Sequence, residues 1–315
     1  MDAADLQKLA SRTRSMREMG IALLVASALL ALFLFQPSGP AHPPVARGAE
    51  AASTAPDAFA RVPIEAKAAI VYDLAAGKTL YQKNADAQLP LASLTKLLTM
   101  YAAFSELSPA TPIAIPADVT HLDAPHAFSA GQVFTLSDLA RLTLTASLND
   151  GAAAIAEATA ARENRSEIAM LAGTAAALGL SQTYAVNGNG LDVSAMISGG
   201  YGSARDLARL AGALVKEAPD VAAATTGGTA TAVSEGGTSL TVKNTDPMVG
   251  NIPHLLLSKT GYTDLAGGNL ALVFDVGIGH PVSVVVLGSS PEARFTDGTA
   301  LVAATFAHFA GIASL

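Results

Sequence analysis

The chain contains no cysteine and no tryptophan, and only 5% of its 315 residues are aromatic. Without cysteine it can form no disulfide and can use no thiolate as a nucleophile or metal ligand. Charged residues make up only 14% of the chain and the formal net charge is −7. An acidic protein of this kind offers no basic surface for nucleic acid, so no nucleic-acid partner is expected. Hydrophobic residues reach 50%, enough for one large core or two lobes that share a cleft.

Signals for metal ions and phosphate cofactors are also missing. The six histidines form no close pair on one predicted helix face. His121 and His126 are five residues apart, in a stretch whose Pro125 favours a loop. No glycine-rich, phosphate-binding loop links a predicted strand to a predicted helix. The sequence therefore predicts no metal and no cofactor.

An uncharged, almost wholly apolar segment lies near the start of the chain, at residues 21–35, and basic residues precede it. This pattern is typical of an export signal. At about 1.5 Å per residue the segment spans roughly 22 Å, short of a hydrocarbon core of roughly 30 Å. No small-x-small cleavage site follows closely, so an uncleaved anchor is favoured over a cleaved signal. Residues 1–20 would then be cytoplasmic, and the proline- and alanine-rich residues 36–57 would tether residues 58–315 outside the membrane.

The most informative motif is Ser93-Leu94-Thr95-Lys96, at the start of an apolar, helix-like run. Residues three apart on a helix share a face, so Lys96 is expected beside the Ser93 hydroxyl. A serine hydroxyl becomes a good nucleophile when a base takes its proton. Lysine can be that base if burial or nearby positive charge lowers its pKa. By itself, however, the pattern is more often a helix cap followed by a solvated lysine.

Two further motifs follow in order, Ser147-Leu148-Asn149 and Lys259-Thr260-Gly261. Each alone is compatible with an ordinary helix, cap or strand end. Together, the three motifs form the set that characterises β-lactamases and penicillin-binding proteins. The chain resembles the serine D-Ala-D-Ala carboxypeptidases, the low-molecular-mass penicillin-binding proteins of the peptidase S11 type. The resemblance covers about residues 57–315 and extends to Asn187–Asp192, Ser203–Ala208 and Ala266–Gly267.

Hydrophobic patterning predicts strands at both ends of residues 58–315 and helices between them. The expected strands are 68–74, 78–83, 239–244, 254–259, 269–276 and 282–287. The expected helices are 93–107, one or two over 135–161, then 166–178, 203–216 and 298–309. This order favours an α+β fold with one sheet built from distant segments. It agrees with the β-lactamase/transpeptidase-like fold that the resemblance implies, an antiparallel sheet with flanking helices and a helical lobe.

The resemblance also implies the site residues. The expected catalytic residues are Ser93 as nucleophile, Lys96 as general base, Ser147 as proton relay and Asn149 as support for Lys96 and the substrate. The expected substrate-binding residues are Lys259, Thr260, Gly261 and Tyr262, with the backbone N–H groups of Ser93 and Tyr262 as the oxyanion hole. The implied substrate is a peptidoglycan stem peptide ending in D-Ala-D-Ala, and β-lactams would be covalent inhibitors.

Two positions depart from the family pattern. Leu148 occupies the middle of the second motif, where relatives often carry a small residue, and Ser258 stands where carboxypeptidases commonly have glycine. Arg205 and Arg294 are expected to be structural, most simply in salt bridges.

Three alternative functions remain open. A class A-like β-lactamase needs a deacylating glutamate after the second motif, but no glutamate lies between Glu167 and Glu217. A DD-endopeptidase would use the same catalytic residues with a different groove. A non-catalytic, membrane-tethered wall-binding protein would be expected to lack the serine or a lysine, and this chain has them.

Overall fold

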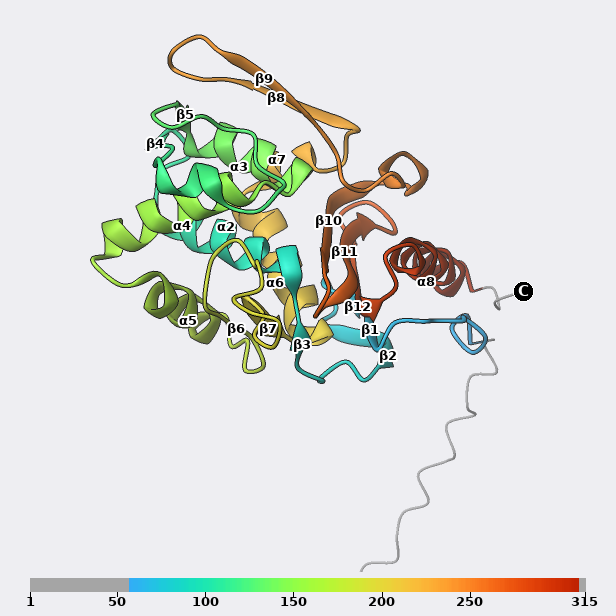
Figure 1. Ribbon diagram of the computed structural model, residues 1–315. Coiled ribbons are helices and arrows are strands. Elements are labelled where there is room, and N and C mark those ends of the chain that lie inside the picture. Colours follow the sequence, from blue (N-terminus) through green and yellow to red (C-terminus); the bar gives the residue numbers. More distant parts are fainter. Residues whose placement is uncertain (1–56, 312–315) are drawn as a thin grey trace, which may run out of the picture. The chain divides into compact units, whose positions relative to one another are not determined.

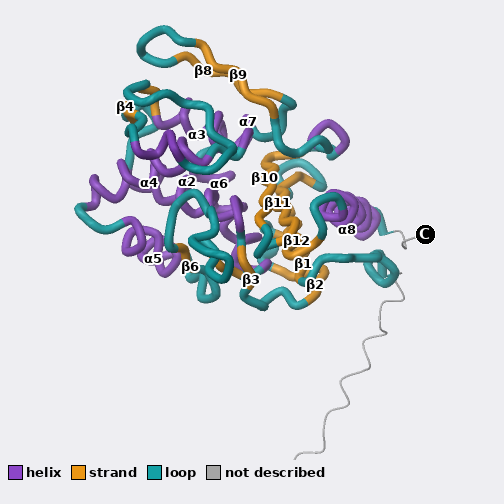
Figure 2. Tube along the Cα trace, in the orientation of Figure 1, coloured by secondary structure: helices purple, strands orange, loops and turns teal. Residues whose placement is uncertain are grey.

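The computed structural model describes residues 57–311, which belong to one compact unit. At its centre is a five-stranded antiparallel sheet (Figures 1 and 2). In spatial order its strands are β10 (Leu255–Thr263), β11 (Gly267–Asp275), β12 (Pro281–Ser289), β1 (Ala68–Asp73) and β2 (Lys78–Lys83). Strand β1 pairs with β12, so segments from opposite ends of the described chain are neighbours in the sheet. The expected sheet of distant segments is confirmed.

Both faces of this sheet are covered by helices. Successive residues of a strand point to opposite faces. On β11, Ala271 therefore joins the core that includes α6 (Ala204–Glu217), whereas Leu272 joins a second core that includes α8 (Ala293–Phe309). Figure 1 shows α8 against one face of the sheet, with α6 and the helical lobe on the other.

The helical lobe surrounds α2 (Thr95–Glu106), whose first residues are buried on every side. A helix that is buried all round must lie inside a bundle rather than on its surface. Its helical neighbours are α3 (Leu136–Ala146), α4 (Asn149–Glu163), α5 (Glu167–Ala177) and α6, whereas α7 (Pro219–Ala224) packs against α3. The start of α2, which carries Lys96 and follows the turn with Ser93, thus lies in the interior.

Short strands and turns complete the unit. Strands β3 (Leu89–Pro90), β7 (Gly200–Gly202) and β6 (Tyr184–Ala185) form one small sheet, in that spatial order. Two further pairs are β4 (Pro112–Ala114) with β5 (Val133–Thr135), and β8 (Thr229–Val233) with β9 (Ser239–Lys243). The β8–β9 hairpin extends from the body at the top of Figure 1. The 3-10 turns are η1 (Ala92–Leu94), η2 (Asp118–His121) and η3 (Val249–Asn251).

The structure corrects several predicted boundaries. Of the two alternatives predicted for residues 135–161, one helix or two, the structure shows two, because Ser147 adopts a left-handed backbone with φ 60° and ends α3 before α4 begins. Strand β10 continues beyond the predicted end at residue 259 to Thr263, since its last residues pair with the start of β11. The final helix begins at Ala293, ahead of the predicted residue 298. The strand predicted at 239–244 pairs with β8 and stays outside the main sheet.

The predicted segments 1–20 and 21–35, and all of 36–57 except residue 57, lie outside the described residues. Within residues 57–311, none of the helices combines the length and the apolar character that crossing a bilayer requires. The α+β fold is confirmed, and the N-terminal membrane helix stays a prediction.

Candidate active site

Ser93 lies in the η1 turn that leads directly into the buried helix α2. The turn is closely packed against two other segments. A Cβ atom at Gly190 would lie 2.1 Å from the carbonyl oxygen of Ala92, and one at Gly261 would lie 3.3 Å from the backbone nitrogen of Ser93. Side chains would not fit at these two positions without movement, so glycine there lets a loop and strand β10 approach the serine.

Lys96 is fully buried one helical turn after Ser93. Its Nζ atom lies 2.9 Å from Ser93 Oγ, 2.7 Å from Asn149 Oδ1 and 2.5 Å from the carbonyl oxygen of Asn189. The Nδ2 of Asn149 donates to the carbonyl of Asp123 at 2.8 Å, which fixes the amide with its oxygen toward Lys96. The predicted Ser93–Lys96 contact is therefore present, and Asn149 supports Lys96 as expected.

These three contacts have a stereochemical consequence. A neutral amine has two N–H donors and one lone pair. The oxygens of Asn149 and Asn189 can only accept, so together they take both donors of a neutral Lys96. The lone pair is then directed to the third partner, the Ser93 hydroxyl. This arrangement allows Lys96 to accept the Ser93 proton.

The electrostatic setting favours that neutral form. Burial, together with the positive charge of Lys259, holds the pKa of Lys96 well below its usual value, while the carboxylate of Asp150 acts in the opposite direction. Asp150 is itself buried and accepts hydrogen bonds from the backbone of Ala127 and Phe128. The net shift in pKa favours the neutral form of Lys96, which can accept a proton.

Lys259 and Ser147 form the second part of the cluster. Lys259 Nζ donates to Ser147 Oγ at 2.8 Å and to the carbonyl of Thr260 at 2.7 Å. Burial, with a contribution from the Arg294 guanidinium, lowers the pKa of Lys259 to about 7. Ser147 is held in its left-handed conformation at the α3–α4 junction. Such a backbone costs about 1–3 kcal/mol in a residue other than glycine, which is typical of functional positions.

Strand β10 brings the third motif alongside the turn that carries Ser93. Thr260 Oγ1 lies 2.6 Å from Thr245 Oγ1, and Arg294 donates to the carbonyl of Gly261 at 2.8 Å. The Tyr262 side chain is 49% exposed at the strand's outer end. The structure thus places the third motif, at the end of the β10 strand, beside the Ser93–Lys96 pair.

The two departures from the family pattern have local explanations. Leu148 is buried in the main hydrophobic core. Ser258 Oγ donates to the carboxylate of Asp246 at 2.6 Å, and Ser258 N donates to Thr225 Oγ1 at 2.9 Å. Leu148 therefore contributes to packing, and Ser258 fastens strand β10 to the segment that precedes it.

Several groups that contribute to the site were not predicted from the sequence. The carbonyl of Asn189 acts through the backbone, which no side-chain motif reveals, although Asn189 does lie in the family-like Asn187–Asp192 segment. Asp150 directly follows the second motif, and that position was the available signal. Arg205 forms the expected salt bridge, to Asp86 at 2.6 Å. Arg294 bonds to a backbone carbonyl instead, so the expectation of a salt bridge there is not met among the described contacts.

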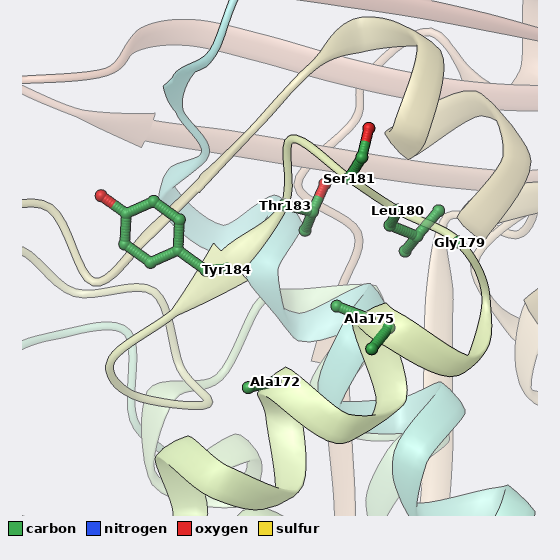
Figure 3. A pocket seen from close by; sticks show the side chains of 8 residues that line it. Ala172, Ala175, Gly179, Leu180, Ser181, Thr183 and Tyr184 are labelled. Atoms are coloured by element: carbon green, nitrogen blue, oxygen red, sulfur yellow. The ribbon is translucent and has the colours of Figure 1, made fainter. Parts of the chain in front are cut away.

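Other features of the described residues offer less chemistry. A cavity of about 410 Å³ lies between the end of α5 and the segment leading into β6, and Figure 3 shows side chains that line it. Its lining, which includes Ala172, Leu180 and Tyr184, supplies no carboxylate, amine or imidazole. Across residues 57–311, no three His, Asp or Glu side chains come together as a metal site.

Comparison with known proteins identifies the family. Residues 51–290 match the family model for D-alanyl-D-alanine carboxypeptidases, peptidase S11. The chain belongs to this family. It is accordingly a serine peptidase of the D-alanyl-D-alanine carboxypeptidase family, and the predicted resemblance is confirmed.

Two curated relatives of this S11 peptidase differ in the reaction for which they are named. The D-alanyl-D-alanine endopeptidase of Pseudomonas aeruginosa is 30% identical over 263 residues, covering 80% of this chain and 82% of the relative. The carboxypeptidase DacC of Escherichia coli is 30% identical over 201 residues, covering 60% of this chain and 46% of the relative. The match thus spans under half the length of DacC.

Solved structures share the fold of the S11 peptidase. Penicillin-binding protein D2 of Listeria monocytogenes, in an ampicillin-bound form, superposes with a TM-score of 0.66 at 29% identity, covering 78% of this chain and 98% of that protein. The Streptomyces K15 DD-transpeptidase gives a TM-score of 0.65 at 25% identity, covering 78% and 98%.

Proposed function

We propose that this S11 peptidase removes the terminal D-alanine of peptidoglycan stem peptides through an acyl-enzyme on Ser93. The observation that carries the proposal is the set of contacts around Lys96 Nζ, with two carbonyl oxygens and the Ser93 hydroxyl as its partners. In the acylation step, Ser93 Oγ attacks the carbonyl carbon of the penultimate D-alanine and its proton moves to Lys96. The backbone N–H groups of Ser93 and Tyr262 would stabilise the oxyanion, a role worth about 3 kcal/mol per donor.

Ser147 completes the acylation by protonating the leaving amine. Because Lys259 donates to Ser147 Oγ, the hydroxyl hydrogen of Ser147 can be donated to another partner. We assign that partner as the leaving nitrogen, which departs with the terminal D-alanine when the peptide bond breaks. The proton held by Lys96 then returns to Ser147. Water attacks the remaining ester while Lys96 takes its proton, and that proton passes to Ser93 Oγ as the ester bond breaks and the shortened peptide leaves.

The substrate's terminal carboxylate would be held by Lys259 and Thr260. Lys259 is the cation nearest to Ser147 among the described hydrogen bonds, and Thr260 lies next to it on β10. Gly261 permits the substrate backbone to lie along this strand, and the exposed Tyr262 would border its outer end. A β-lactam carries a carboxylate and a reactive carbonyl, so it would occupy the same positions and acylate Ser93.

Slow deacylation of β-lactams is expected because, in the part of the chain that the structure describes, no carboxylate is hydrogen-bonded to the Ser93 hydroxyl. Within residues 57–311, Ser93 Oγ has Lys96 as its hydrogen-bonding partner, and the carboxylate of Glu167 is bonded to the Gly188 N–H. A class A-like β-lactamase requires a glutamate that activates the deacylating water. This supports an enzyme that β-lactams inhibit over one that destroys them.

Endopeptidase action on peptide crosslinks is the second candidate. It is favoured by the relative from Pseudomonas aeruginosa, which is named as an endopeptidase and covers most of this chain. The catalytic residues would be the same in both reactions. The two differ in whether the leaving amine belongs to free D-alanine or to a side chain of a neighbouring peptide.

One assay separates the candidates. The purified protein is incubated with a pentapeptide ending in D-Ala-D-Ala and, separately, with a crosslinked dimer of stem peptides, and products are quantified by mass spectrometry. Release of D-alanine from the pentapeptide supports the carboxypeptidase. Cleavage confined to the dimer supports the endopeptidase. The absence of both products, with the protein folded, would contradict the proposal and favour a wall-binding role.

Peptidoglycan as substrate implies a site of action in the bacterial cell envelope. Attachment to the cytoplasmic membrane through residues 21–35 is a separate proposal, supported by the apolar run and its basic flank. Comparing membrane and soluble fractions of cells that produce the full chain or a chain lacking residues 1–35 would test it.

A further inference from the structure

The carbonyl of Asn189 that orients Lys96 belongs to a loop between β6 and β7. The backbone of Gly188, the residue immediately before Asn189, is held at both its N–H and its carbonyl oxygen. Gly188 N donates to Glu167 Oε1, and the carbonyl oxygen of Gly188 accepts from Thr99 Oγ1 at 2.7 Å. Glu167 is the first residue of α5, and Thr99 lies three residues after Lys96 on α2, so it shares the Lys96 face. The loop is thereby fastened to two helices next to the catalytic lysine.

The packing around Gly188 is tight enough to transmit this restraint. A Cβ atom at Gly188 would lie 2.6 Å from Ala156 Cβ, 2.9 Å from Glu167 Oε1 and 3.0 Å from Thr99 Oγ1. The backbone of Gly188 therefore fills a notch formed by α2, α4 and α5. A shift of this peptide would move the next carbonyl in the chain, which is the one that accepts from Lys96.

From these contacts we infer that Glu167 is a positioning residue for the reaction, acting with Thr99 to hold the Asn189 carbonyl against Lys96. The inference rests on the proposed role of Lys96 as general base. Glu167 contacts neither the nucleophile nor Lys96, so its effect passes through one peptide unit. Its contribution is to keep the lone pair of Lys96 on the Ser93 hydroxyl.

The chemistry of this contact suggests an informative pair of variants. The Gly188 N–H needs an acceptor, and the carbonyl oxygen of a glutamine side chain can serve as one. Glu167→Gln should therefore preserve the function, whereas Glu167→Ala removes the acceptor. Glu163→Ala is the matched control, because Glu163 is also acidic and partly buried, lies four residues earlier, and bonds to Arg165 instead of the loop.

The experiment measures acylation by benzylpenicillin under stopped flow and separates the binding constant K from the acylation rate constant k2. For Glu167→Ala we expect k2 to fall about tenfold while K is unchanged, since the loss of one hydrogen bond affects the base and not the carboxylate site. Glu167→Gln and Glu163→Ala should keep k2 within about twofold of the unsubstituted protein. Thr99→Val should lower k2 as Glu167→Ala does, and Thr99→Ser should restore it.

The outcomes are distinguishable. If the unsubstituted protein and Glu163→Ala are not acylated, the proposed function itself is wrong. If they are acylated and Glu167→Ala matches them in k2, or if Glu167→Gln is as slow as Glu167→Ala, the positioning role is overturned. If Glu167→Ala does not fold, the comparison of k2 between Thr99→Val and Thr99→Ser decides the same question, because Thr99 holds the carbonyl oxygen of Gly188. Equal k2 values for these two variants would then overturn the positioning role.

Discussion

We predict that Lys259 lowers the free energy of unfolding of the protein near neutral pH. Burial and the nearby Arg294 guanidinium lower the pKa of this side chain from 10.5 to about 7. Between pH 7 and pH 10.5, Lys259 is mostly protonated in the unfolded chain but mostly unprotonated in the folded protein. Stability therefore rises with pH across this window, and the gain is complete only above pH 10.5.

The magnitude follows from the same two pKa values. Raising the pH from 7 to 9 should add about 2 kcal/mol to the free energy of unfolding through Lys259 alone. Replacing Lys259 by methionine removes the titrating group and keeps a similar volume. The Lys259→Met protein should thus be the more stable of the two at pH 7, and its advantage should shrink by about 2 kcal/mol at pH 9.

The assay is equilibrium unfolding in urea at pH 7 and pH 9, on the unsubstituted protein and on two variants. Lys243→Met serves as the control, because Lys243 is an exposed lysine on strand β9. Its difference from the unsubstituted protein should be nearly the same at both pH values. A constant difference for Lys259→Met as well would show that the folded state keeps Lys259 protonated throughout, and would refute the reasoning.

Three further predictions concern the site. Acylation by benzylpenicillin should follow a bell-shaped pH profile in stopped flow, rising as Lys96 loses its proton and falling above about pH 7 as Lys259 loses its charge; a profile that rises steadily to pH 10 would contradict these assignments. Asn149→Ala should slow acylation about tenfold to a hundredfold by removing an acceptor from buried Lys96, whereas Asn149→Asp should raise the pKa of Lys96 and move the rising limb of the pH profile to higher pH. Gly261→Val should destabilise the fold by about 1–3 kcal/mol and slow acylation, because its Cβ would lie 3.3 Å from Ser93 N; an unchanged melting temperature and rate would refute the close approach.

Much of the fold follows from local patterns. Most strand residues of the main sheet were predicted, because these strands carry alternating or continuous apolar runs. The strand at 78–83 has the predicted bounds. The short strands β6 and β7 were not predicted, because they have only two and three residues and are fixed by contacts with distant segments. Two helices over residues 135–161 were one of the predicted alternatives, but the break between them could not be placed, because Ser147 adopts a left-handed backbone that its residue type does not favour.

The side chains of the site were predictable because acyl transfer needs particular groups at fixed spacings. The contacts that hold these side chains in place could not be predicted from the sequence. Lys96 depends on the backbone carbonyl of Asn189, which lies 93 residues away in the sequence. The loop carrying it depends in turn on Glu167 and Thr99, whose residue types alone give no hint of that contact. Long-range backbone contacts of this kind appear only when the chain is folded.

The proposed mechanism depends on Ser93 forming the acyl-enzyme with Lys96 as its base. It can be tested by a time course of intact mass for residues 57–315 with excess benzylpenicillin, in parallel with a Ser93→Ala variant. We expect a long-lived adduct of one penicilloyl group on the unsubstituted protein, mapped to Ser93 by peptide analysis and missing from the variant. An adduct that forms and disappears with rapid drug turnover would indicate a β-lactamase. No adduct on the folded protein, or an equal adduct on Ser93→Ala, would contradict the mechanism.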